Sequence, residues 1–397
     1  MVIYLPTAVI FVYLLCRLIL PLKINKKRKL ALGLVLLVIS QSHLLKGLLF
    51  GGLSSPELPA PVLMVQGALF VGLLFLLLLT VARDIFLLLR KIARPLLPPT
   101  EDKISPGRRR FLTTGLRAVP AALGARQALA PGLVMLPAAY GVSRAVAAPV
   151  MKTITLRLPN LPPELDGLAL IQVSDLHVSP LLKGDWVTGI VRQINAAEPD
   201  LILLTGDLVD GMPANRADSL MPLKNLKSRY GLYACPGNHE YYNGFHSWMD
   251  FFPQLGINTL LNEHKTLTIN GRELVVAGVT DPVASRFSLP GPDLGRALKG
   301  APDKAVRILL DHRPGQAPIN ALAGLDLQLS GHTHGGQMPI MSQLVTAANN
   351  GFLRGLYDVR GMSLYVNSGA GLWNGFPVRL GVPGEISRLV LRPAIVG

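Results

Sequence analysis

Five short polar motifs contain five of the chain's eight histidines, and each motif directly follows an apolar run. In chain order they are Ser174-Asp175-Leu176-His177, Gly206-Asp207-Leu208-Val209-Asp210, Pro236-Gly237-Asn238-His239-Glu240, Asp311-His312-Arg313-Pro314 and Gly331-His332-Thr333-His334-Gly335-Gly336-Gln337. Carboxylate and imidazole groups are ligands that suit Mn, Fe, Zn or Ni, whereas softer metal ions prefer thiolate ligands. These residue types therefore predict a site for divalent metal ions.

The spacing inside two of the motifs would bring neighbouring ligands to one place. Asp175 and His177 are two residues apart, as are His332 and His334. In an extended segment residues i and i+2 point to the same side, so each pair would present two ligands together. One carboxylate can bridge two ions roughly 3.5–4 Å apart, and such a pair of ions holds the attacking and leaving oxygens of a phosphoryl transfer. The motifs thus favour phosphoester chemistry.

Buried strands must position these motifs. After residue 151, short apolar runs alternate with loops that contain Gly and Pro, and residues 186–195 have a helical pattern. Ligand sites in α/β sheets gather at the carboxyl ends of strands, which is where the motifs stand. We therefore expect an α/β domain with layered sheets. The predicted strands are 168–173, 201–204, 230–234, 274–277, 306–310, 325–329 and 363–366.

The motifs resemble those of the calcineurin-like metallophosphoesterases. D-x-H, G-D-x-x-D, G-N-H-E, a single His and G-H-x-H follow one another, and all five blocks are intact. The later stretches 364–371 and 377–386 are similar to the YaeI/YkuE branch, whose catalytic domain is typically exported or membrane-attached. The resemblance covers about residues 154–392 and implies a two-sheet β-sandwich flanked by helices, the αββα fold.

The resemblance also implies a role for each matching residue. One metal ion would bind Asp175, His177, Asp207 and His334, and the other would bind Asp207, Asn238, His312 and His332, so that Asp207 bridges them. His239 would contact the phosphate and protonate the leaving oxygen. Asp210 would hydrogen-bond to His239 and fix its tautomer, the alternative being an ordinary turn carboxylate. Glu240 could be only a helix-start residue, and the roles of Asp311 and Arg313 stay open.

The first 150 residues have the composition of a membrane anchor. Apolar runs cover 2–20, 30–50 and 61–82, each near the ~20 residues that cross a bilayer. Residues 1–150 carry 18 Lys/Arg against 4 Asp/Glu, whereas 151–397 carry 21 against 20. Basic loops between spans set orientation, and nucleic-acid binding is not expected without a basic stripe on the second half. We predict an anchor over 1–110, with about three transmembrane helices and basic cytoplasmic loops.

Residues 111–150 would decide on which side of the inner membrane the catalytic domain, 151–397, lies. Gly107-Arg108-Arg109-Arg110-Phe111-Leu112 resembles a twin-arginine export signal, and Ala145-Val146-Ala147 resembles a cleavage site. As a fourth span or as a cleaved signal, the segment would place the domain on the periplasmic side. The alternative is a cytoplasmic linker.

We therefore expect a metal-dependent hydrolase of phosphodiesters or phosphomonoesters at the inner membrane, where a lipid-linked phosphate is a natural substrate. Two alternatives stay open: a cytoplasm-facing phosphodiesterase or pyrophosphatase of nucleotide-linked lipid precursors, and an inactive relative that serves as a binding scaffold.

Aromatic residues near the motifs could line a substrate lip, lie at the membrane surface or form core. They are Tyr241, Tyr242, Phe245, Trp248, Phe251 and Phe252, with Trp373 and Phe376 further on.

Overall fold

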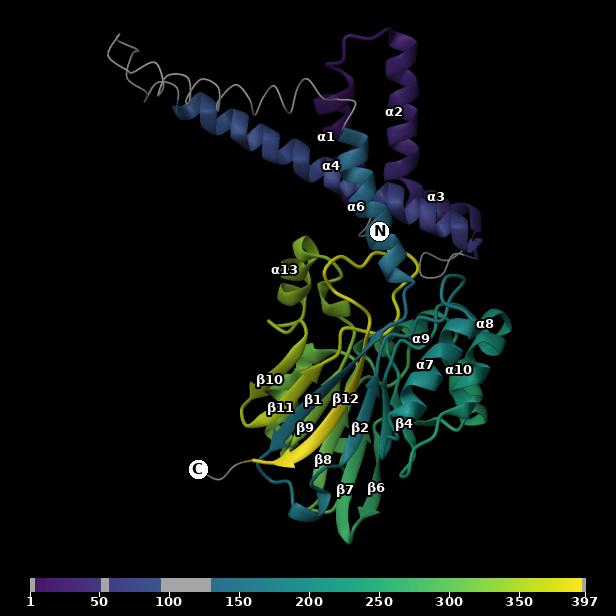
Figure 1. Cartoon of the computed structure of the whole chain (residues 1–397), viewed down its shortest axis with the longest axis vertical. Coiled ribbons are helices and arrows are strands. Elements are labelled where there is room, and N and C mark those ends of the chain that lie inside the picture. Colours follow the sequence, from purple (N-terminus) through teal and green to yellow (C-terminus); the bar gives the residue numbers. More distant parts are fainter. Residues whose placement is uncertain (1–3, 51–56, 94–129, 395–397) are drawn as a thin grey trace. The chain divides into compact units, whose positions relative to one another are not determined.

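The computed structural model describes residues 4–50, 57–93 and 130–394. The chain divides into two compact units, which we describe separately. The first comprises Met1–Leu49 and Val65–Tyr140, and the second comprises Phe50–Met64 and Gly141–Gly397. Figure 1 traces the whole chain from purple at the N-terminus to yellow at the C-terminus.

The first unit is built from apolar helices. They are α1 (Tyr4–Leu14), which continues as a π-helical segment (Leu15–Ile19), α2 (Lys26–Ser40), α3 (Ser42–Phe50) and α4 (Ala60–Ala93). Among the described residues, α4 is the one helix that is long and apolar enough to cross a membrane. The α2–α3 pair is bent by 65° and makes a second candidate if it counts as one span, while Pro6–Ile19 is a shorter apolar helix.

A three-span anchor is therefore not confirmed in the part of the chain that the structure describes. The second apolar run is interrupted at Gln41, where the Ser40 hydroxyl donates a 3.0 Å hydrogen bond to the Leu37 carbonyl. The twin-arginine-like segment and the start of the predicted fourth span lie outside the described residues. Helix α6 (Ala130–Ala145) covers the end of that run and contains Pro137.

The second unit contains two six-stranded mixed sheets. The first has the order β1-β12-β2-β3-β4-β5, in which β2 to β5 are parallel and β12 is antiparallel to β2. Its strands are β1 (Val150–Leu158), β2 (Ala169–Val173), β3 (Leu201–Thr205), β4 (Leu232–Cys235), β5 (Asn258–Thr259) and β12 (Glu385–Pro393).

The second sheet has the order β10-β11-β9-β8-β7-β6. Its four central strands are parallel, and each outer strand pairs antiparallel with its neighbour. The strands are β6 (Glu263–Ile269), β7 (Arg272–Gly278), β8 (Val306–Leu310), β9 (Leu327–Ser330), β10 (Gly355–Val359) and β11 (Met362–Val366). All seven strands predicted from the sequence are present, with shifts of a few residues at their ends.

Hydrophobic cores lie between the sheets and on both outer faces. Successive strand residues point to opposite sides, so Leu203 of β3 packs between the sheets and Leu204 packs under helices. In β7, Val276 faces the inner core and Val275 faces the outer one. The first outer face is covered by α7 (Gly184–Ala196), α8 (Pro213–Leu220) and α10 (Phe245–Phe251), which lie together in Figure 1. The second is covered by α11 (Leu294–Ala297) and α12 (Ala317–Asn320).

This layering confirms the predicted αββα sandwich. Helix α9 (Asn238–Tyr242) begins within the third motif, and α13 (Pro339–Ala348) follows the fifth. Each of the five motifs begins at the residue after a strand, namely β2, β3, β4, β8 or β9. Gln172 joins the two sheets near these ends, because its Nε2 donates 3.0 Å hydrogen bonds to Thr205 Oγ1 and to the Ser330 carbonyl.

Candidate metal centre

The backbone turns sharply at the predicted ligands that follow three of the strands, β2, β3 and β9. Five predicted ligands have a left-handed backbone conformation that side chains rarely adopt: Asp175 (φ 53°), His177 (φ 44°), Asp207 (φ 53°), His332 (φ 68°) and His334 (φ 47°). The expectation that ligands two residues apart converge because the chain is extended is therefore wrong. The ligands converge because left-handed residues fold the chain, and such strain is concentrated at functional sites.

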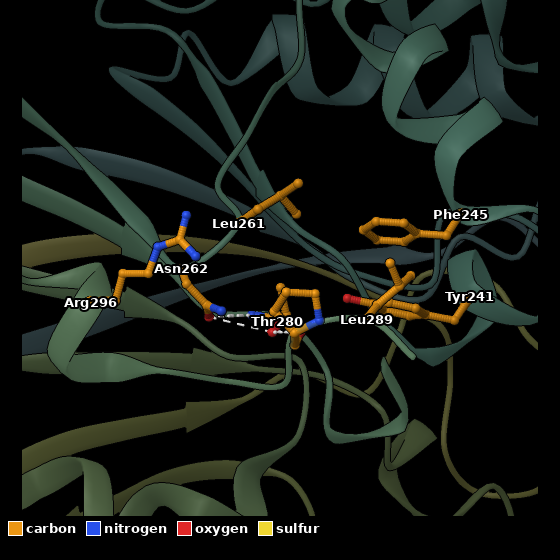
Figure 2. A pocket seen from close by; sticks show the side chains of 8 residues that line it. Tyr241, Phe245, Leu261, Asn262, Thr280, Leu289 and Arg296 are labelled. Carbon is orange, nitrogen blue, oxygen red and sulfur yellow. Dashed lines mark hydrogen bonds between the residues drawn. The ribbon is translucent and has the colours of Figure 1, made fainter. Parts of the chain in front are cut away.

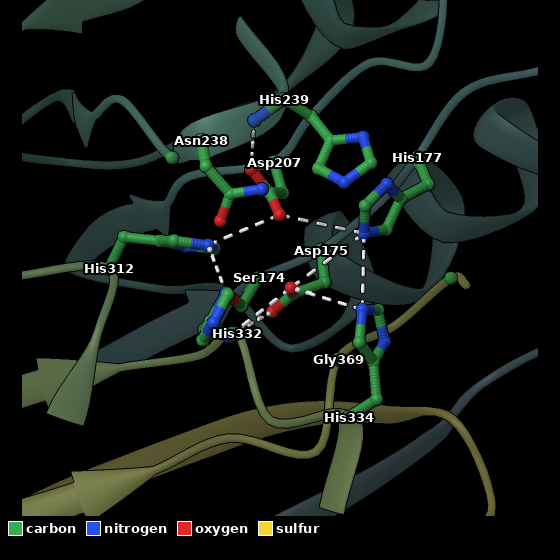
Figure 3. Close-up of polar contacts among 12 residues, drawn as sticks. Ser174, Asp175, His177, Asp207, Asn238, His239, His312, His332, His334 and Gly369 are labelled. Atoms are coloured by element: carbon green, nitrogen blue, oxygen red, sulfur yellow. Dashed lines mark hydrogen bonds and ion pairs between the residues drawn. The ribbon is translucent and has the colours of Figure 1, made fainter. Parts of the chain in front are cut away.

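Asp175, His177 and His334 form the first group of ligand atoms (Figure 3). His177 Nε2 lies 3.2 Å from His334 Nε2. The Asp175 Oδ1 atom lies 3.8 Å from the first nitrogen and 3.5 Å from the second. All three side chains are buried, so together they could hold one divalent ion.

Asp207, His312 and His332 form the second group. His312 Nε2 lies 3.1 Å from Asp207 Oδ2 and 3.2 Å from His332 Nδ1. Asp207 Oδ2 is also 3.8 Å from His177 Nε2, in the first group. A single carboxylate oxygen thus faces both groups, as a bridging ligand must, and Figure 3 shows Asn238 beside it.

Hydrogen bonds outside the groups hold the outward nitrogens of two histidines. His312 Nδ1 donates to the Thr205 carbonyl at 2.7 Å, and His177 Nδ1 lies 3.2 Å from Asp210 Oδ1. In the neutral form with the proton on Nδ1, which a metal ligand must adopt, each ring turns a lone pair on Nε2 toward the site. Both Nε2 atoms face another ring nitrogen at 3.2 Å, an arrangement that a shared cation satisfies. The donor set therefore fits two divalent ions.

The electrostatics also favour positive charge. Burial alone would raise the pKa values of the Asp175 and Asp210 carboxyls, but neighbouring histidines lower both below the ordinary range. Burial opposes charge on His312, yet the Asp207 carboxylate outweighs it and raises the pKa of His312 to about 10. Burial lowers the pKa of His334 to about 3, so this imidazole stays neutral and able to bind a metal ion.

Asp210 contacts two histidines, of which the sequence predicted one. Its Oδ1 atom lies 2.5 Å from His239 Nδ1, as expected, and also 3.2 Å from His177 Nδ1. Its Oδ2 atom accepts a hydrogen bond from the Asn374 backbone at 3.1 Å. The carboxylate is fully buried, so it is not a solvated turn residue. Through its Oδ1 atom, Asp210 holds His239 beside the second motif.

Glu240 has a larger role than starting a helix. Its carboxylate accepts backbone hydrogen bonds from Gly237 at 2.7 Å, Asp207 at 3.0 Å and Leu208 at 2.7 Å. It therefore caps α9 and ties the third motif to the second. The G-N-H-E spacing, which is that of a capping box, could have indicated the first of these contacts. A Cβ atom on Gly237 would lie 2.3 Å from Asp207 Oδ1, so only glycine allows this approach.

Arg379 is a buried residue of the site that sequence reasoning did not single out. It is 2% exposed, and its guanidinium donates to the carbonyls of Ser368, Gly369, Gly371, Val382 and Pro383 at 2.6–3.3 Å. The loop that it holds pairs with the first motif, because Ala370 N donates to Ser174 O at 2.8 Å and Gly371 N to Asp175 O at 2.9 Å. Arg379 thus fixes the loop whose Gly371 N–H holds the backbone of Asp175.

The aromatic cluster is divided between core and site. Trp248 and Phe252 are 0% and 1% exposed and pack in the outer core. Phe251 packs against the same core. Tyr241 and Phe245 stack with ring centroids 4.2 Å apart and line a cavity of about 200 Å³ (Figure 2). None of these five side chains is among the metal ligands.

Two other aromatic residues flank His239. The Tyr242 ring lies edge-on at 5.4 Å between centroids and is 38% exposed, and the Trp373 ring lies at 6.2 Å. Trp373 and Phe376 lie in the late loop (residues 367–384, between β11 and β12), where Phe376 is half-buried. The substrate-lip interpretation therefore applies to Tyr242 and Trp373, which could contact the organic part of a substrate.

Comparison with known proteins places the chain in a family. The family description "Calcineurin-like phosphoesterase" matches residues 168–336, from the start of β2 to the last polar motif. A protein of Aquifex aeolicus named "Uncharacterized metallophosphoesterase" is 32% identical over 226 residues, which are 56% of this chain and 85% of that protein. The chain belongs to the calcineurin-like metallophosphoesterase family.

Two further relatives are longer than the matched region. A Helicobacter pylori "Uncharacterized metallophosphoesterase" is 40% identical over 62% of this chain and 65% of its own length. A Bos taurus "Transmembrane protein with metallophosphoesterase domain" is 33% identical over 62% of this chain and 58% of its own length. The chain thus spans less than two thirds of these relatives. YkuE of Bacillus subtilis, 29% identical over 84% of its length, supports the predicted branch.

Proposed function

We propose that this chain is a two-metal-dependent hydrolase of phosphoester bonds. The observation that carries the proposal is the position of Asp207, whose Oδ2 atom faces His312 Nε2 at 3.1 Å and His177 Nε2 at 3.8 Å. One carboxylate between two groups of nitrogen ligands is suited to a pair of metal ions. The proposed ligands are Asp175, His177, Asp207 and His334 for one ion, and Asp207, Asn238, His312 and His332 for the other.

Divalent ions at these ligands supply Lewis acidity toward a phosphoryl group and an attacking water. The bond from the water oxygen to phosphorus forms, and the bond from phosphorus to the leaving oxygen breaks. We assign His239 as the group that donates a proton to the leaving oxygen. Its Nδ1 atom is held by the buried Asp210 carboxylate, so Nε2 is the nitrogen that can donate.

The protein is proposed to act at a membrane. The N-terminal 110 residues would be the anchor, 111–150 a further span or signal-like linker, and 151–397 the catalytic domain on the periplasmic side of the inner membrane. Support comes from the candidate span α4 and from the name of the Bos taurus relative. A lipid-linked phosphate is the substrate class that this position favours. Alkaline-phosphatase and fluorescent-protein fusions after Gly397 test the orientation, since fluorescence without phosphatase activity would contradict it.

Hydrolysis of bis(p-nitrophenyl) phosphate and p-nitrophenyl phosphate, with and without added Mn²⁺, tests the activity. We expect metal-dependent release of p-nitrophenol that is lost in Asp207→Ala. Asp166→Asn is the matched control, because Asp166 forms an exposed ion pair with Arg392. A folded, metal-loaded wild type that hydrolyses neither compound would instead support the inactive-scaffold alternative. If the wild type is active, a lipid screen that compares it with Asn238→Ala would identify accumulated substrates.

A further inference from the structure

Arg313 follows the ligand His312 and reaches across the edge of the metal centre. Its Nε atom donates a 2.6 Å hydrogen bond to Asp281 Oδ2, and the side chain is 29% exposed while Asp281 is fully buried. Asp281 is itself fixed, because it caps the short 3-10 helix Pro282–Phe287 by accepting from Val283 N at 2.8 Å. One edge of the guanidinium is therefore anchored, and the other faces the site.

The two terminal nitrogens of Arg313 contact proposed metal ligands. Nη2 donates to Asn238 Oδ1 at 3.0 Å, and Nη1 lies 3.3 Å from His332 Nε2. When the ring proton of His332 is on Nδ1, the atom that faces His312 Nε2 at 3.2 Å, its Nε2 atom is the acceptor for Arg313.

Metal binding would remove both acceptors. Asn238 Oδ1 would be used by the ion, and a metal ion on His332 Nδ1 requires that the proton of the neutral ring be on Nε2, which faces Arg313. Arg313 would keep Asp281 as its partner and have two free N–H donors at the exposed side of the centre. A guanidinium with two parallel donors matches the oxygens of a phosphoryl group.

We propose that Arg313 binds the non-bridging oxygens of the substrate's phosphoryl group and that Asp281 positions it for this task. The inference rests on the proposed phosphoester hydrolysis and adds a substrate-binding residue to it. In the metal-free centre the terminal N–H groups of Arg313 contact Asn238 and His332. In the metal-loaded centre the same N–H groups donate to the phosphoryl group. Lysine keeps the charge and lacks the paired donors, so it replaces Arg313 only in part.

Titration calorimetry of the full-length, Mn²⁺-loaded protein with inorganic phosphate tests this directly, together with kcat and KM for p-nitrophenyl phosphate. Arg313→Ala should weaken phosphate binding and raise KM by about ten- to hundredfold, the range for a lost charge-assisted hydrogen bond. Arg313→Lys and Asp281→Asn should show smaller changes in the same direction. Metal content should stay at the wild-type value. Arg272→Ala, which removes an exposed pair with Glu164, should change neither quantity.

Two outcomes would overturn the inference. In one, Arg313→Ala and Arg313→Lys bind phosphate as wild type does. In the other, both variants lose metal ions in proportion to their loss of phosphate affinity, which would make Arg313 a support of Asn238 and His332 alone. Failure of the proposed function looks different, since wild type itself would then hydrolyse neither p-nitrophenyl ester.

Discussion

His239 Nδ1 lies 2.5 Å from Asp210 Oδ1, and this buried pair stands beside both groups of metal ligands. The contact fixes the ring so that Nε2 is free to act on a leaving oxygen. Because Asp210 also lies 3.2 Å from His177 Nδ1, one carboxylate orients both a proposed metal ligand and the proposed proton donor. The two functions are therefore coupled through a single side chain.

The proposed acid role of His239 predicts a dependence on the leaving group. His239→Ala should lower kcat by about 10²–10⁴-fold for a phenyl ester, the range for loss of a general acid. The loss should be smaller for a p-nitrophenyl ester, because p-nitrophenolate leaves without a proton. Steady-state kinetics on the two esters measure the difference. An equal loss for both would assign His239 to substrate binding instead.

Asp210→Asn should reproduce much of this defect and add a second one. The amide keeps the shape but carries no charge, and it has one acceptor oxygen in place of the two that contact His239, His177 and the Asn374 backbone. We expect a lower kcat and weaker binding of metal ions at His177. Equilibrium dialysis against Mn²⁺, alongside His239→Ala, separates the effects. Unchanged metal affinity in Asp210→Asn would show that its contact with His177 has no energetic role.

The buried Arg379 predicts a stability defect. Replacement by Leu removes a charge and the guanidinium donor to five carbonyls, of which, within the described residues, Gly369 alone keeps a backbone donor, Glu385 N. Loss of such a network typically costs about 3–5 kcal/mol, so the melting temperature should fall markedly. Arg379→Lys should recover part of it. Arg392→Leu is the matched control, because this exposed arginine pairs with Asp166 at the surface and should change little. Comparable melting temperatures for the two leucine variants would contradict the structural role.

Glu385 predicts acid sensitivity of the sandwich. Burial would raise its pKa, but hydrogen bonds from Lys152, Tyr365 and Ser387 outweigh burial and lower the pKa below its ordinary value of 4.5. A depressed folded-state pKa gives stability that is present above the unfolded-state value and lost as the pH falls through the folded-state value.

Glu385→Gln should therefore lower the melting temperature at pH 7 and reduce its dependence on pH below about 4.5. Scanning calorimetry of both proteins between pH 3 and 7 measures the two slopes. Asp358→Asn is a suitable control, because its carboxylate is at an exposed hairpin turn. If Glu385→Gln retains the wild-type slope, other carboxylates cause the acid transition.

The sequence allowed an α/β core and the ligand types to be predicted, because strands such as β4 are continuous apolar runs that end in polar motifs. The αββα arrangement came from the resemblance of the motifs to a known family. The sequence did not reveal the edge strand β1 or its neighbour β12, whose apolar residues are interrupted by polar and charged ones. The pairing of Asp175 with His177 was predicted for the wrong reason. Left-handed conformations at these residues depend on contacts with distant loops, and no local pattern encodes them.

The supporting residues were missed for a similar reason. Arg379 contacts carbonyls that become neighbours only when the late loop folds against the first motif, and Glu240 bonds to a motif 32 and 33 residues away. Such partners have no spacing rule in the sequence. The predicted membrane spans failed for a local reason. Hydropathy counts apolar residues but does not register the break at Gln41, where the second run is bent.

Metal content and hydrolysis, measured on the same preparations of wild type and Asp207→Ala, test the central claim most directly. The account predicts two divalent ions per wild-type chain by elemental analysis, with Mn²⁺-dependent hydrolysis of bis(p-nitrophenyl) phosphate. Removing the shared carboxylate should release metal from both groups of ligands and abolish hydrolysis, while Asp166→Asn keeps both. Two bound ions and undiminished hydrolysis in Asp207→Ala would contradict it.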